Sequence, residues 1–322
     1  METTKYPEPR IAQERGAVVP QYCCWHTSRQ NLWRCYTTEE STMETEEFRD
    51  ITYQKSADGI VTLTFNTPRR KNAVSPLSFL EVFWAVDHFE NDDSAYAMII
   101  TGAKDPKSDD PTKEAFSSGG YFAPDALEGL SDKILQQIDM SDIAQKKATL
   151  KLYQCYKPVI GAINGLTIGG AFTLALAGCD QIYMSEHAWI QLPFAKLGIA
   201  AELASTFLLP RVLGFQKAKE IMFFSERIDA VKAVDLGLAN AVVPHGELLA
   251  YAREKALQII PPRGAGMAIR EMKRIMHQPH IEAVSQALDL ENEALNKLMT
   301  SEDFVEGMMA RIERREATFK GR

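Results

Sequence analysis

The chain is short of cysteine, of net positive charge and of long apolar runs, and each shortage excludes a class of protein. Its five cysteines, two of them adjacent at Cys23 and Cys24, form neither a disulfide framework nor a CxxC zinc pair. A net charge of −7 argues against broad electrostatic attraction to nucleic acid or to anionic membranes. No apolar run approaches the ~20 residues that span a bilayer. We therefore expect an intracellular protein of a reducing compartment, without a metal site.

What is present is the composition of a globular protein, 45% hydrophobic and 25% charged over 322 residues. The first 45 residues lack hydrophobic periodicity and are predicted to be a poorly ordered leader. Within it, Arg34–Thr38 is similar to a mitochondrial cleavage site, although the early glutamates are unusual in a transit peptide, and Met43 is an alternative start. The final residues, FKGR, are not an SKL-type peroxisomal address. The sequence therefore leaves peroxisome, mitochondrion and cytoplasm all open as the location of the protein.

Beyond the leader, strand-like and helix-like segments alternate. Residues 51–66 alternate polar and apolar side chains around Asp58-Gly59 and predict a β-hairpin. The runs AYAMIITGA and VIGAING predict buried strands, and helix-like patterns lie between and after them. Strands that alternate with helices predict an α/β fold with right-handed crossovers.

Two further segments are predicted to be helical, namely residues 125–155 and the charged segment from about Pro262 to Arg322. The second of these cannot form a core of its own, so we expect it to pack on the body or on another subunit. The chain is therefore divided into a leader (1–45), a core (46–258) and a C-terminal helical region (259–322).

Two short segments, Phe116–Phe122 (FSSGGYF) and Ile168–Phe172 (IGGAF), each place a glycine pair between a strand pattern and a helix pattern. Glycine lets a ligand approach the backbone N–H groups closely, and a helix N-terminus adds unpaired donors. Two such donors that converge on one oxygen form an oxyanion hole. Taken alone, each pair more often marks a tight turn or close helix packing. Neither segment is a phosphate-binding GxxxxGK[ST] or GxGxxG loop.

These segments resemble the crotonase (enoyl-CoA hydratase/isomerase) superfamily over about residues 48–320. FSSGGYF and AINGLTIGGAFTLALAGCD resemble its two oxyanion segments, TFNTPRRKNAVS its coenzyme A loop, and the stretch from PFAKLGI to ANAVVP the segment that follows. The resemblance implies a crotonase-like ββα spiral core, a C-terminal helical trimerisation region and a homotrimer or homohexamer. It implies an acyl-CoA substrate, with the amides of Gly120 and Gly170 as oxyanion donors.

The resemblance also implies where coenzyme A is held. The basic loop before Asn72 is expected to meet the adenine and phosphates, although a solvated charge run is an alternative reading. The expected contacts are Arg70, Lys71, Asn72, Ala73, Ser118 and Lys273. Relatives often carry aspartate where this chain has Tyr121, so Asp125 is expected to cap the following helix instead.

The acidic residues are the most informative part of the comparison. Hydratases of this superfamily use two glutamates to activate water, and the corresponding positions here are Thr173 and Ala195. One carboxylate is left in the neighbourhood, Glu202, the only ionisable residue between Lys196 and Arg211. Its position resembles that of the single glutamate of Δ3,Δ2-enoyl-CoA isomerases. An alternative is that Glu202 only interacts favourably with a helix N-terminus.

We therefore expect an enoyl-CoA isomerase that shifts a double bond from C3–C4 to C2–C3. One carboxylate between those carbons is able to remove the C2 proton and return it at C4, and apolar surroundings should strengthen it as a base. No metal or redox cofactor is needed, and coenzyme A is part of the substrate.

Other readings stay open. One is another crotonase chemistry, a hydratase, hydrolase or lyase, in which Glu202 works with an acid from residues 121–150. The candidates there are Asp125, Glu128, Asp132, Asp139 and Asp142. Another is a non-catalytic acyl-CoA-binding relative, and a third is an RNA-binding relative, against which the acidic net charge argues. No Ser-His-Asp arrangement is apparent in the sequence, and the acyl chain and pathway are not determined by it.

Overall fold

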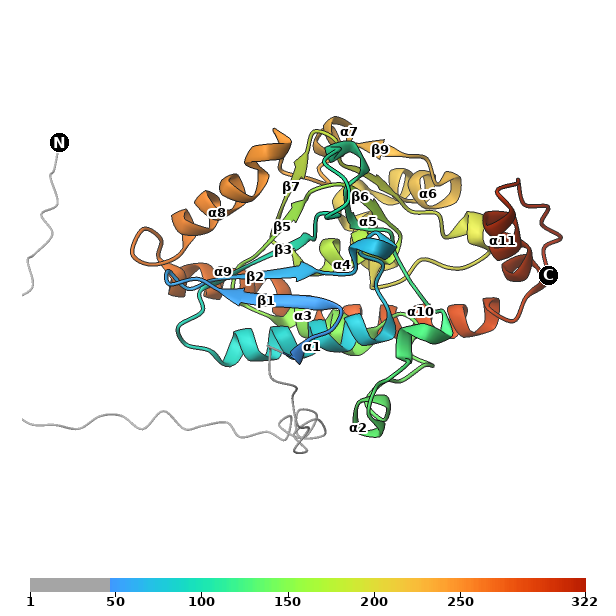
Figure 1. Cartoon of the computed structure of the whole chain (residues 1–322), viewed down its shortest axis with the longest axis horizontal. Coiled ribbons are helices and arrows are strands. Elements are labelled where there is room, and N and C mark those ends of the chain that lie inside the picture. Colours follow the sequence, from blue (N-terminus) through green and yellow to red (C-terminus); the bar gives the residue numbers. More distant parts are fainter. Residues whose placement is uncertain (1–46) are drawn as a thin grey trace, which may run out of the picture. The chain divides into compact units, whose positions relative to one another are not determined.

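The structure is a computed structural model and describes residues 47–322. The predicted leader, with the features at Arg34–Thr38 and Met43, lies outside the described residues. Ten strands run through the described part (Figure 1): β1 Ile51–Lys55, β2 Ile60–Phe65, β3 Ala97–Gly102, β4 Ala115–Ser117, β5 Val159–Ile163, β6 Leu166–Ile168, β7 Gln181–Ser185, β8 Trp189–Gln191, β9 Ile228–Asp229 and β10 Ala241–Val243.

The described α-helices are α1 Pro76–Asn91, α2 Asp132–Leu135, α3 Lys146–Gln154, α4 Gly170–Gly178, α5 Ser205–Leu213, α6 Phe215–Phe224, α7 Ala230–Asp235, α8 Leu248–Ile259, α9 Gly266–His277, α10 Ile281–Leu298 and α11 Glu302–Glu313. Short 3-10 helices are η4 Pro68–Arg70, η5 Pro111–Lys113, η6 Pro124–Leu127, η7 Ala195–Leu197, η8 His245–Glu247 and η9 Gln278–His280. The predicted hairpin, buried strands and C-terminal helices are confirmed. Residues 125–155 are helical only in part, at η6, α2 and α3.

The strands form two sheets. The larger has the order β1-β2-β3-β5-β7-β10, with an antiparallel β1–β2 hairpin and parallel pairs from β2 onward. The smaller has the order β4-β6-β8-β9, in which β4, β6 and β8 are parallel. Parallel neighbours need crossover connections, and here helices such as α1 and α4 supply them. This arrangement fits the α/β fold predicted from the alternating pattern.

The larger sheet is covered on both faces, which explains why its central strands are apolar throughout. On one face, Ile99 of β3 and Ile160 of β5 pack with Ala252 of α8. On the other face, Ile100 of β3 and Phe89 of α1 belong to the main core. Figure 1 shows α8 on one side of β3, β5 and β7, with α1, α3 and α10 on the other.

Candidate active site

The two glycine segments lie side by side because the strands before them are neighbours. Strands β4 and β6 pair in parallel, with Ser117 opposite Thr167, so their carboxyl ends lie at the same edge of the smaller sheet. The segments then pass very close to each other. A Cβ atom at Gly119 would lie 2.7 Å from the carbonyl oxygen of Ile168, and Gly119 has a φ of +88°. Glycine at 119 is therefore required both by the backbone conformation and by the space.

The amide of Gly120 faces away from its neighbouring strand. Val74 forms a parallel bridge with Gly120, in which the Val74 N–H donates to the Gly119 carbonyl and the Tyr121 N–H donates to the Val74 carbonyl. Both bonds use the residues on either side of Gly120. Its own N–H has no acceptor among the described residues and is free for a ligand oxygen.

The amide of Gly170 is free for a different reason. Gly170 is the first residue of α4, and helix N-termini leave their first N–H groups unpaired. Among the described residues, the carbonyl of Gly169 accepts hydrogen bonds from Phe172 and Thr173, and the Gly170 N–H has no acceptor. Gly169 precedes the helix with φ 55° and ψ −125°, a conformation open in practice only to glycine. The expected pair of donors, Gly120 and Gly170, is thus available on adjacent segments.

Glu202 lies directly against the second of these glycines. Its Oε1 atom is 2.6 Å from the place that a Cβ atom at Gly170 would occupy. The Glu202 residue is only 9% exposed, and no hydrogen bond from a described residue reaches its carboxylate. Burial, and then the negative charge of Glu291, raise the pKa of Glu202 to about 8. A carboxylate without donors in apolar surroundings is a strong general base.

Neither position expected for a water-activating acid holds a carboxylate. Thr173 is fully buried, and its hydroxyl points back to the Gly169 carbonyl oxygen at 3.5 Å, as a helix-interior threonine often does. Ala195 is exposed on η7, and it is the preceding residue, Phe194, that is buried with its ring 3.7 Å from the Cβ position of Gly169. In this segment the side chain beside Gly169 is therefore that of Phe194, which carries no acid.

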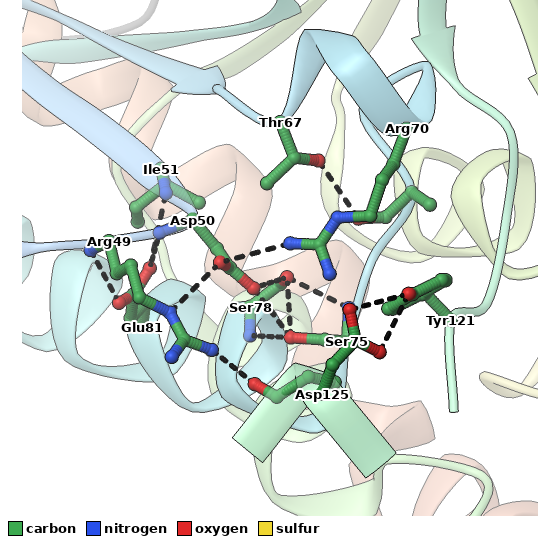
Figure 2. Close-up of polar contacts among 12 residues, drawn as sticks. Arg49, Asp50, Ile51, Thr67, Arg70, Ser75, Ser78, Glu81, Tyr121 and Asp125 are labelled. Atoms are coloured by element: carbon green, nitrogen blue, oxygen red, sulfur yellow. Dashed lines mark hydrogen bonds and ion pairs between the residues drawn. The ribbon is translucent and has the colours of Figure 1, made fainter. Parts of the chain in front are cut away.

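The three cationic side chains of the basic loop, Arg69, Arg70 and Lys71, differ in their exposure and in their partners. Figure 2 shows Arg70 turned inward, with its guanidinium 3.7 Å from a carboxylate oxygen of Asp50 and 4.4 Å from the ring centre of Tyr121. Lys71 is exposed, and its Nζ lies 3.3 Å from the carbonyl oxygen of Lys113. Arg69 is also exposed. For a phosphate-binding role, Lys71 and Arg69 are accessible, whereas Arg70 already has an anionic and an aromatic partner.

Asn72, Ala73 and Ser118 have mainly structural contacts. Asn72 is 1% exposed, and its Nδ2 donates to the carbonyls of Ala103 and Ala115, which ties the loop to the strands β3 and β4. Ala73 is 6% exposed. Ser118 donates its hydroxyl to the Arg70 carbonyl and its N–H to the Lys71 carbonyl. These residues hold the basic loop against the first glycine segment.

Lys273 does not fit the expected phosphate contact. It is 4% exposed, and its Nζ donates to Asp180 at 2.9 Å and to the Lys157 carbonyl at 3.1 Å. An ammonium group buried with these partners pins α9 to the core, and reaching a phosphate would leave Asp180 without its partner. The prediction that Lys273 contacts coenzyme A is therefore wrong.

The expectation that Asp125 caps the following helix is wrong. The residue before η6 is Ala123, and no side chain caps that helix. Asp125 instead accepts the Tyr121 hydroxyl on both carboxylate oxygens, at 2.8 and 2.9 Å (Figure 2). Tyrosine at 121 therefore has two partners, the Asp125 carboxylate and the guanidinium of Arg70.

The other acids of residues 121–150 are not gathered at the glycines. Asp142 accepts hydrogen bonds from the Lys146 N–H and from Asn292, so it joins α3 to α10. Asp139 accepts hydrogen bonds from Ser141. Glu128 and Asp132 are exposed. None of these contacts prepares a second acid beside Glu202.

Two features were not visible in the sequence. Ser185, His245 and Glu114 form a chain, with 3.0 Å between Ser185 Oγ and His245 Nδ1 and 3.4 Å between His245 Nε2 and a Glu114 oxygen. Ser185 is fully buried, so it is no nucleophile for an external substrate.

The second feature that was not visible in the sequence is Glu291 of α10, which lies near Glu202 although it is 89 residues away in the chain. No local pattern marks such long-range partners.

Between residues 47 and 322, no group of three histidine, cysteine, aspartate or glutamate side chains is arranged to hold a metal ion. None of the helices in that range is long and apolar enough to cross a membrane.

Comparison with known proteins agrees with this geometry. The family described as enoyl-CoA hydratase/isomerase matches residues 55–322. The chain is 32% identical to the mevalonyl-coenzyme A hydratase sidH of Aspergillus fumigatus over 265 residues, 81% of this chain and 91% of that protein. It is 28% identical to the short-chain-enoyl-CoA hydratase of Clostridium acetobutylicum over 286 residues, 86% of this chain and 100% of that protein.

The fold is shared with solved structures as well. The enoyl-CoA hydratase/isomerase of Pseudoalteromonas atlantica superposes with a TM-score of 0.71 at 24% identity, over 84% of this chain and all of that one. The free glycine amides, the buried glutamate beside them and the family match over most of the chain lead to one conclusion. The chain belongs to the enoyl-CoA hydratase/isomerase family and is an enzyme with the crotonase fold.

Proposed function

We propose that this protein is an enoyl-CoA isomerase that moves a double bond of an acyl-CoA thioester from C3–C4 to C2–C3. The observation that supports it is the lone carboxylate of Glu202, which lies beside Gly170 and has no hydrogen-bond donor among the described residues. Neither Thr173 nor Ala195, the two positions expected for the acids of a hydratase, carries a carboxylate. One base without an acid partner suits proton transfer between two carbons better than activation of water.

In the proposed reaction, the ionised Glu202 removes a proton from C2. The C–H electron pair forms a C2–C1 double bond, and the thioester carbonyl oxygen takes the negative charge of the dienolate. The N–H groups of Gly120 and Gly170 donate to that oxygen. Losing one such donor typically costs 10²–10³ in rate. Protonated Glu202 then returns its proton to C4, and the double bond comes to lie between C2 and C3.

This chemistry requires no redox cofactor or metal, and coenzyme A enters with the substrate. The exposed cations Arg69 and Lys71 are proposed to meet its phosphates, and Arg70 is proposed to contact it only if it leaves Asp50. Asn72, Ala73 and Ser118 are proposed to shape the same loop from behind.

The deciding experiment gives the purified protein a 3-enoyl-CoA and a 2-enoyl-CoA and follows conjugation and hydration separately. We expect isomerisation to dominate. Glu202→Gln should remove nearly all of it while thioester binding stays close to that of the wild type. Retention of more than about a tenth of kcat, a barrier change below ~1.4 kcal/mol, would contradict the role of Glu202.

A hydratase is the second candidate, because the two curated relatives named above are hydratases. In that case Glu202 would need a second acid, and Asp125 is the first to test because the Tyr121 hydroxyl holds it next to the first glycine segment. Hydration of a 2-enoyl-CoA as fast as isomerisation, abolished by Asp125→Asn, would favour this candidate. A chain that binds thioesters and converts neither would be a non-catalytic relative.

A further inference from the structure

The turn that carries Glu202 is conformationally unusual. The two residues after it, Leu203 and Ala204, have φ values of 56° and 60°, in the left-handed region, and both are fully buried. For residues with a Cβ atom this conformation is unfavourable, because the Cβ atom comes too close to the following carbonyl oxygen. Two consecutive non-glycine residues persist there only when surrounding contacts hold them. The Ser205 N–H donates to the Glu202 carbonyl at 3.2 Å and closes the turn locally. Contacts from outside the turn are expected to add to this bond in fixing its shape, and with it the direction of Glu202.

Glu291 of α10 supplies those contacts. Its Oε2 atom accepts the Ala204 N–H at 2.8 Å, and its Oε1 atom accepts the Thr206 N–H at 3.0 Å and the Thr206 hydroxyl at 2.6 Å. Helix α5 begins at Ser205, and Ala204 at its N-cap has no side-chain acceptor. Glu291 therefore does from another helix what a capping serine or aspartate does locally.

The setting of Glu291 shows that this is not an incidental surface contact. The residue is 3% exposed and lies on the buried stripe of α10 with Val284, Leu288 and Leu295. A carboxylate in such surroundings is costly unless its oxygens have donors. Here the donors come from the segment immediately after Glu202.

We propose that Glu291 is a positioning residue for the reaction: it holds the Leu203–Ala204 turn and so directs the Glu202 carboxylate to the place beside Gly170. This rests on the proposed role of Glu202 as the base. An apolar residue at 291 would leave two N–H groups unpaired, and the turn would relax toward ordinary backbone angles.

The same arrangement places a negative charge near the base. Besides burial, Glu291 is the only group among the described residues that moves the pKa of Glu202, and it raises it. Burial raises the pKa of Glu291 as well, and hydrogen bonds from Thr206 and Ala204 oppose that rise. Loss of the charge at 291 should therefore let Glu202 ionise at lower pH.

The test compares Glu291→Gln with a control, Glu293→Gln, which makes the same chemical change at an exposed position of the same helix. Isomerisation is measured from pH 6 to pH 10. For Glu291→Gln we expect kcat to fall ~10–100-fold because the base is misdirected, with KM within about threefold of the wild type. The midpoint of the pH profile should move to lower pH. Glu293→Gln should match the wild type in all three.

A purely structural role would lower thermal stability and leave kcat and the pH midpoint of the folded protein unchanged, and that result would overturn the proposal. If Glu291→Gln does not accumulate as folded protein, Thr206→Val decides. It removes one of three donors, so a fall in kcat of at least threefold is expected, with recovery in Thr206→Ser, which restores the hydroxyl. An unchanged kcat in Thr206→Val would then reject the positioning role.

The proposed isomerase function and the coupling between Glu291 and Glu202 are tested by different measurements. If the wild type isomerises nothing, carbon-13 NMR of glutamate-labelled protein still follows the titration of Glu202, assigned by its absence in Glu202→Gln. A lower midpoint for Glu202 in Glu291→Gln supports the coupling without any turnover. Identical midpoints in the two proteins would reject it.

Discussion

At the scale of single residues, two buried carboxylates have opposite surroundings. Asp50 accepts hydrogen bonds from the hydroxyls of Ser75 and Ser78 and is paired with Arg70 (Figure 2). The carboxylate of Glu202 accepts none from the described residues. The donors around Asp50 tie it to the start of α1 and to the basic loop, which is a structural role. A buried carboxylate without hydrogen-bond donors is a stronger base. This difference, rather than burial alone, separates the candidate base from the supporting acids.

The raised pKa of Glu202 predicts a stability that falls with pH. Its folded value is about 8 and its ordinary value 4.5, so the folded state binds the proton more tightly than the unfolded state. The associated stability is fully present below about pH 4.5 and is lost as pH rises through about 8. Glu202→Gln removes this loss because glutamine does not ionise. We expect Glu202→Gln to be more stable than the wild type by about 1–2 kcal/mol at pH 8.5, a rise of ~2–6 °C in Tm.

Thermal melts at pH 5 and pH 8.5 check this prediction, with Glu293→Gln as the control. The gain should be small at pH 5 and larger at pH 8.5. An equal gain at both values would show that the proton on Glu202 is not the cause.

Gly170→Ala should impair catalysis more than folding. The new Cβ atom would lie 2.6 Å from Glu202 Oε1, the end of a flexible side chain, so the carboxylate moves while the backbone keeps its shape. A displacement of about 1 Å typically costs up to 10²-fold in rate. The matched control is Gly246→Ala, where the new atom meets nothing within 4 Å. Equal kcat in wild type and Gly170→Ala would contradict the placement of Glu202.

At the scale of elements, the Ser185–His245–Glu114 chain links the two sheets. Ser185 ends β7 in the larger sheet, His245 begins η8, and Glu114 precedes β4 in the smaller sheet. Glu114 also accepts the Asn164 amide at 2.9 Å. Since β4 leads directly into the first glycine segment, the chain helps to fix the sheet edge from which that segment starts.

His245→Ala is expected to lower stability without removing activity. It removes a hydrogen-bond partner of the buried Ser185 hydroxyl, which typically costs ~1–3 kcal/mol. Thermal melts and isomerase rates at 25 °C give the two readouts, and His280→Ala, at an exposed histidine, is the comparison. Loss of activity at full folding would show that the chain acts in the reaction itself.

The elements that local sequence specifies were predicted well. The hairpin turning at Asp58-Gly59 and the helix that begins at Gly170 are set by neighbouring residues, and both are present. Residues 125–155 were overpredicted as helix, because their turns are held by side chains such as Asp142, whose partner Asn292 is far along the chain. The left-handed backbone at Leu203 was equally hidden, since it depends on contacts that no local pattern records.

At the scale of the whole molecule, the described residues leave large apolar side chains exposed on the later helices. They include Phe215, Phe223 and Phe224 on α6 and Met267, Ile275 and Met276 on α9. Exposed large apolar side chains of this kind are common on association surfaces. We predict a trimer or a dimer of trimers. Light scattering should give a mass of three or six times 36.0 kDa, and a stable monomer at micromolar concentration would contradict it.

The distance along the chain between Glu202 and Glu291 has a consequence for how the protein matures. Both glycine amides and the base leave the ribosome well before α10 does, so a nascent chain already carries them while the Ala204 and Thr206 N–H groups still lack their acceptor. Contacts between such distant segments form late in folding. The positioning role proposed for Glu291 therefore predicts that Glu202 is directed toward Gly170 only after α10 has docked.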